Sequence, residues 1–63
     1  MKKYFITNDI GEALDLSRVV GRKVFEKNGD YAIEIKDTDK VGRIIKETKK
    51  EIDDIKKWGV VDE

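Results

Sequence analysis

Residues 22–36 read RKVFEKNGDYAIEIK, and this stretch carries the strongest hairpin signal in the chain. Asn28-Gly29 separates two extended runs, and these two residue types best tolerate the positive φ that both central positions of a type I′ turn require. From Tyr31 to Ile35, large apolar residues alternate with small or charged ones, as in a strand with one buried face. The stretch therefore predicts a β-hairpin.

A two-residue loop also sets the register of this hairpin. It places Lys27 opposite Asp30. In the same register Lys23 faces Glu34, so both cross-strand pairs join opposite charges. A hairpin alone is only marginally stable in water, so the rest of the chain must cover its apolar face.

The residues before the hairpin predict a strand followed by a helix. Residues 3–7 are aromatic and β-branched, which favours a short strand. Asp9 is a good N-cap, apolar residues then recur at helical spacing, and Gly21 follows where a left-handed residue commonly ends a helix. We therefore predict a helix over Ile10–Val20. A rival interpretation makes Glu12–Val20 a strand, because part of this segment also alternates between apolar and polar residues.

The residues after the hairpin predict a second and longer helix, Lys40–Trp58, with Gly59 as its C-cap. Gly42 falls in the first turn of this helix, where a glycine suggests the close approach of another backbone. Val60-Val61 adds a short strand or folds back. The apolar residues that recur at steps of four and three are Val41, Ile45, Thr48, Ile52 and Ile55.

These elements follow the order β-α-β-β-α. The simplest arrangement is a small three-stranded sheet with two helices on one face, in a single α+β domain of 63 residues. If the first two strands are parallel in one sheet, their crossover should be right-handed. The chain contains no Cys and no His, which excludes disulfides and the usual zinc sites. Oligomerisation remains as a way to stabilise so short a chain.

The amino-acid composition argues against several classes of function. The chain has 14 basic and 14 acidic residues, and a net charge of zero argues against a general nucleic-acid or membrane binder. No apolar run approaches the roughly 20 residues of a membrane span. The N-terminal residues also lack the apolar core of a signal peptide, so we expect a cytoplasmic protein.

The sequence offers little support for catalysis. Ser17 is the only serine, and neither a Cys nor a His is present to act as nucleophile or base. Asp37 and Asp39 are typical of a turn and N-cap. Asp53 and Asp54 are adjacent on the predicted helix, so their side chains point about 100° apart. No glycine spacing matches a phosphate-binding loop, and we expect neither enzymatic activity nor a cofactor.

The sheet face away from the helices is the candidate binding surface. If Val24 and Ile33 point inward, Phe25 points to the other face, which either Phe5 or Tyr4 together with Ile6 must share. Aromatic residues surrounded by charge are typical of a protein interface, so we predict a protein-binding module and a homodimer. Stacking of single-stranded nucleic acid is the alternative function, and a face partly covered by the chain termini is the third possibility. The candidate interface residues are Tyr4, Phe5, Lys23, Phe25, Lys27, Ala32 and Trp58.

Overall fold

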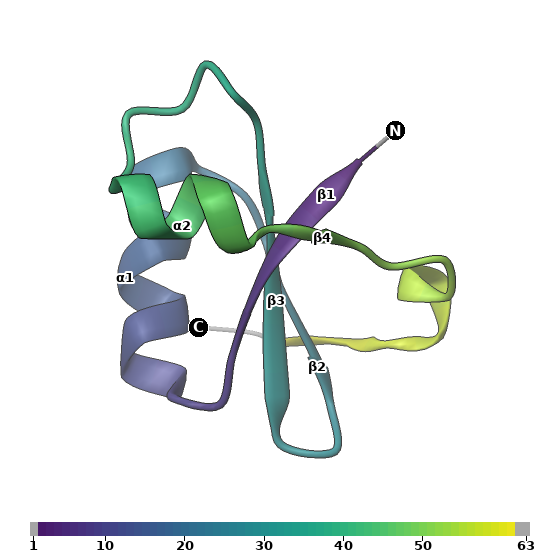
Figure 1. Ribbon diagram of the computed structural model, residues 1–63. Helices are drawn as coiled ribbons and strands as arrows, with labels where there is room; N and C mark the ends of the chain where they lie inside the picture. Colours follow the sequence, from purple (N-terminus) through teal and green to yellow (C-terminus); the bar gives the residue numbers. More distant parts are fainter. Residues whose placement is uncertain (1, 62–63) are drawn as a thin grey trace.

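The computed structural model describes residues 2–61, which form five strands and three helical segments (Figure 1). In chain order these are β1 (Lys3–Thr7), α1 (Ile10–Val20), β2 (Val24–Lys27), β3 (Asp30–Ile35), α2 (Arg43–Thr48), β4 (Lys50–Glu51), the 3-10 helix η1 (Ile55–Lys57) and β5 (Gly59–Val61).

The strands form one sheet with the order β4-β1-β3-β2-β5, and each neighbouring pair is antiparallel. The fold is α+β as predicted, but the sheet has five strands and not three. Because β1 and β2 each run antiparallel to β3, they are parallel to one another with β3 between them. The segment β1-α1-β2 is therefore a crossover that spans the central strand.

The predicted hairpin is confirmed in both turn and register. Asn28 has φ 53° and Gly29 has φ 85°, the two positive values of a type I′ turn. Lys27 pairs with Asp30 and Phe25 with Ala32, as the two-residue loop requires. The turn type thus fixes which residues of both strands face α1.

The first helix is also confirmed, with the predicted bounds Ile10–Val20. The carboxylate of Asp9 accepts a hydrogen bond of 3.2 Å from the backbone N–H of Glu12. Gly21 adopts φ 70° and its N–H bonds to the carbonyl of Ser17. Satisfied caps at both ends stabilise the helix, and the rival strand over Glu12–Val20 is wrong.

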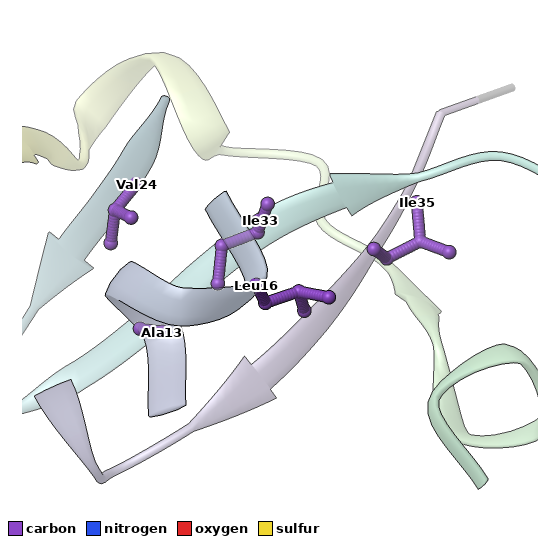
Figure 2. Packing of buried hydrophobic residues seen from close by; sticks show 5 residues of the cluster. All are labelled: Ala13, Leu16, Val24, Ile33 and Ile35. Carbon is purple, nitrogen blue, oxygen red and sulfur yellow. The ribbon is translucent and has the colours of Figure 1, made fainter. Parts of the chain in front are cut away.

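The main core lies between α1 and the sheet (Figure 2). Five buried side chains form it, two from the helix and three from the hairpin strands. Half-buried residues extend this core, among them Phe5 from β1, Val41 from the segment before α2 and Ile45 from α2. The cluster of buried residues is Ala13, Leu16, Val24, Ile33 and Ile35.

The predicted helix over Lys40–Trp58 is wrong, because α2 spans only Arg43–Thr48. Lys49 is extended, with φ −62° and ψ 143°, and it ends the helix although no Gly or Pro lies there. Gly59 begins β5 and is not a C-cap, while the predicted short strand at Val60-Val61 is present. A Cβ added to Gly42 would meet no atom within 4 Å, so no other backbone approaches this glycine closely.

Residues 52–58, here named the strap, connect the two edges of the sheet. Since β4 and β5 lie at opposite edges, the strap must cross a face of the sheet. Figure 1 shows η1 on one side of the central strands and α1 on the other. The strap therefore covers the face that α1 leaves bare, and the sheet is sandwiched between two layers.

Candidate functional site

Three of the predicted interface residues gather on the sheet face opposite α1. Tyr4 and Phe25 meet edge to face, with ring centroids 6.2 Å apart and an interplanar angle of 85°. Ala32 pairs with Phe25 and is 0% exposed, while Tyr4 is 4% exposed. Burial also raises the pKa of the Tyr4 hydroxyl above its usual value. These three residues therefore share one face, as strand alternation predicts, but that face is not a free surface.

The strap is what lies over this face. Trp58 is half-buried, as are Ile52 and Ile55 on either side of the turn into η1. Lys27 Nζ binds Asp54 Oδ2 at 3.1 Å and so fastens the strap to the end of β2. That hydrogen bond is the main reason why the pKa of Asp54 is lowered.

Trp58 packs here as part of the second layer. Its buried indole Nε1 makes no hydrogen bond of normal geometry within residues 2–61, although the indole contributes to lowering the pKa of Asp54. Because this indole N–H is buried, it is not available to a partner, and Trp58 serves as a packing residue of the strap.

The remaining predicted interface residues lie apart from that cluster. Phe5 points to the α1 side and packs against the main core. Lys23 is exposed and precedes β2, and Lys27 is engaged with the strap. The candidate set thus does not form one continuous exposed patch. The third possibility expected the chain termini on this face, whereas an internal segment, the strap, lies there.

The structure reveals a different exposed apolar surface, a groove of about 710 Å³ between α1 and the segment 40–45. Its apolar lining includes Leu16 from α1 and Val41 and Ile45 from the opposite wall. Val19, which is 67% exposed, also lines the groove. Ile44, which is 74% exposed, neighbours Ile45 on α2. We name this surface the helical groove.

The two walls of the helical groove carry opposite charges. Asp9, Glu12 and Asp15 line the wall that α1 forms, whereas Lys40 lines the facing wall. Such a surface combines an apolar floor with charged rims, which is the usual anatomy of a protein interface. The sequence gives one weak indication of the helical groove. Ile44 makes the apolar stripe of the predicted second helix wider than packing on one face requires.

A charged clamp holds the loop that leads into this groove. Arg22 binds Asp39 through two contacts, Nη1 to Oδ2 at 2.5 Å and Nη2 to Oδ1 at 3.1 Å. The Asp39 carboxylate also accepts a 2.7 Å hydrogen bond from the Lys36 N–H. The Arg22 hydrogen bond, followed by that of Lys36, lowers the pKa of Asp39 to about 2. Asp39 therefore stabilises the loop, in agreement with its predicted turn role. The predicted N-cap role of Asp37 or Asp39 is wrong, because Gly42 is the N-cap of α2.

Ser17 is used structurally in the same region. Its hydroxyl donates to the carbonyl of Arg22, and its own carbonyl accepts from the N–H groups of Gly21 and Arg22. These bonds join the end of α1 to the residue that holds Asp39. The only serine of the chain thus orders the turn that follows α1.

Three further observations bear on function. Among residues 2–61 no three His, Cys, Asp or Glu side chains lie together in a way that could hold a metal ion. Neither helix in this part of the chain has the length and apolar character needed to cross a membrane. Comparison with protein-family models, curated proteins and solved structures finds no match to the chain.

Proposed function

We propose that the chain is a small interaction module that binds another protein, and that its first partner is a second copy of itself. The observation that carries this proposal is the position of Val19 and Ile44. They are the most exposed large apolar residues of the described chain, at 67% and 74%. Val19 lines the helical groove from α1, and Ile44 lies on α2 next to Ile45, which lines the facing wall. Apolar side chains grouped beside a groove favour association.

The charges of the groove support a two-fold arrangement. In a symmetric dimer the same patch is used by both copies, so the patch must be complementary to itself. The acidic wall of α1, with Glu12 and Asp15, can face Lys40 of the second copy, while the converse contact forms on the other side of the axis. Val19 and Ile44 then meet near the centre, away from water.

The size of the protein is compatible with such an interface. The accessible surface is 4564 Å². A standard interface takes about 800 Å² from each partner, roughly a sixth of that surface. Because a chain this short buries a small core and has no disulfide, association adds stability that the monomer lacks.

The test is the oligomeric state measured by sedimentation equilibrium from micromolar to millimolar concentration. We expect a monomer–dimer equilibrium that Val19→Gln and Ile44→Gln each shift towards monomer, by about 1–2 kcal/mol from lost apolar burial. Gln favours helices, so both variants should remain folded. Val60→Gln is the matched control, because Val60 is 50% exposed but lies on β5. A monomer at all concentrations, or equal weakening by the control, would contradict the proposal.

Binding of single-stranded nucleic acid is the second candidate, and the structure gives it less support. A stacking platform needs exposed aromatic faces. Of the aromatic residues predicted for this role, Tyr4 is buried and Phe25 is half-buried beside it. Only a movement of the strap would uncover them.

A further inference from the structure

A second concave site lies at the end of the sheet where β1 starts and β3 finishes. It is a hollow of about 460 Å³ lined by side chains from β1, β3 and the residue that follows α2. These segments are distant in sequence, so the fold alone brings their charges together. The charged residues that line the hollow are Lys2, Lys3, Lys36, Lys49, Glu34 and Asp37.

Asp37 lies among these lysines, and its side chain is 91% exposed. Its carboxylate accepts a hydrogen bond from Lys49, whose side chain is only 12% exposed. Its backbone carbonyl accepts a 3.0 Å hydrogen bond from Lys46 Nζ. The pKa of Asp37 is lowered first by Lys49, and the charges of Lys3 and Lys46 act in the same direction. One carboxylate thus lies in the field of several ammonium groups.

The hollow keeps an excess of positive charge after this pairing. Four lysines and two carboxylates line it, which leaves two positive charges in excess. Within residues 2–61 no ion pair joins Lys2, Lys3 or Lys36 to an acidic side chain. Gathering like charges in one place costs free energy, and a bound anion with more than one charge would relieve that cost.

We propose that this lysine hollow binds a small multivalent anion of the oligophosphate class. Lys3 at the start of β1 and Lys36 directly after β3 face the anion, while Lys49 is shared between it and Asp37. The hollow is local and its lining contains no aromatic residue, so it offers no stack for a nucleobase. The hollow and the helical groove share no lining residue, so the proposal does not depend on dimer formation.

The experiment is a titration of the full chain with pyrophosphate, followed by the NMR shifts of backbone amides, against sodium chloride at matched ionic strength. We expect saturable shifts centred on residues 2, 3, 36, 37 and 49. The double variant Lys3→Gln/Lys36→Gln should weaken binding about 10-fold, since exposed charge pairs contribute a factor of about 2–5 each. The matched control is Lys56→Gln/Lys57→Gln, which removes two exposed lysines at η1.

A variant that should bind pyrophosphate more tightly distinguishes a change at the binding site from a loss of folding. Asp37→Asn removes the carboxylate that competes for Lys49, so pyrophosphate should bind about 2- to 5-fold more tightly. Far-UV circular dichroism confirms that each variant is folded. Absence of saturation, equal weakening by the control pair, or unchanged or weaker binding by folded Asp37→Asn would each overturn the proposal.

A second titration, with a single-stranded oligonucleotide, tests whether the hollow binds a small phosphate anion or the phosphates of a nucleic-acid backbone. We expect weaker binding than that of pyrophosphate per site, because the lining of the hollow contains no aromatic residue on which a base could stack. Tighter oligonucleotide binding that is lost in Lys3→Gln/Lys36→Gln would overturn the small-anion proposal in favour of a nucleic-acid backbone.

Discussion

The same substitution, glycine to alanine, should have opposite consequences at two positions of this chain. Gly29 has φ 85° and Gly42 has φ −59°. A Cβ added at either position meets no atom within 4 Å, so packing plays no part in the comparison. Only the backbone conformation differs, and the pair isolates its energetic cost.

The expected magnitudes follow from that difference. An L-residue with a side chain in the left-handed region costs about 1–2 kcal/mol, so Gly29→Ala should lower the free energy of unfolding by that amount. At Gly42 the reduced entropy of the unfolded chain offsets the loss of a good N-cap residue, and Gly42→Ala should stay within about 0.5 kcal/mol of wild type.

Urea denaturation followed by circular dichroism measures both changes, and thermal melting provides a second observable. For a domain of this size a loss of 1 kcal/mol lowers the melting temperature by about 4–8 °C. Gly21→Ala, at φ 70° with equally free space, should resemble Gly29→Ala. If Gly29→Ala and Gly42→Ala have the same midpoint, the assignment of the type I′ turn is wrong.

Two further predictions concern the clamp and the strap. The pKa of Asp39 is about 2 in the folded chain, below its ordinary value of 3.8, so the Arg22–Asp39 pair stabilises the fold above pH 4 and this contribution is lost as the pH falls towards 2. Urea midpoints measured across that range should fall less steeply for Asp39→Asn than for wild type, and parallel curves would contradict the role of the clamp. Trp58→Ala should destabilise the monomer by about 2–4 kcal/mol, because it removes the largest side chain of the strap from the face that carries Tyr4 and Phe25. Denaturation at a concentration where wild type is monomeric tests this, and an unchanged midpoint would show that Trp58 is not a packing residue.

The part of the chain from residue 3 to residue 36 could be predicted because its signals are local. Asp9 and Gly21 mark the two ends of α1, and both caps are made by residues within five positions. The type I′ turn depends on Asn28-Gly29 alone, and its geometry then fixes the strand register. Where start, stop and period are all encoded within one segment, the tertiary structure agrees with the local preference.

The C-terminal part could not be predicted, because two distant faces compete for its apolar residues. Ile45 packs against the core on the α1 side, whereas Ile52 and Ile55 belong to the strap on the other side. A continuous helix would have kept all three on one face and left Tyr4 exposed to water. Burial of the second sheet face outweighs helix propensity, which amounts to less than about 1 kcal/mol per residue. No Gly or Pro marks the break at Lys49.

The candidate binding surface could also be predicted only in part. The side chains that share the far face of the sheet were identified from the alternation of Phe25 and Ala32 with their neighbours. Whether that face is free depends on the path of residues 52–58, which only the three-dimensional structure determines. The helical groove was missed for a related reason, since it forms between α1 and residues 40–45, which the sequence pattern assigns to one long helix.

The attachment of β4 and β5 also bears on aggregation. These outermost strands are two and three residues long, too short to serve as templates for intermolecular pairing, and β4 is made of Lys50 and Glu51. Next to them in the sheet lie the longer strands β1 and β2, which carry Phe5 and Phe25. If residues 50–61 detach while the hairpin remains, Phe5 and Phe25 would lie on unprotected edges that can nucleate cross-β assembly. By pairing with β1 and β2, the C-terminal segment thus covers two edges that would otherwise be open to another chain.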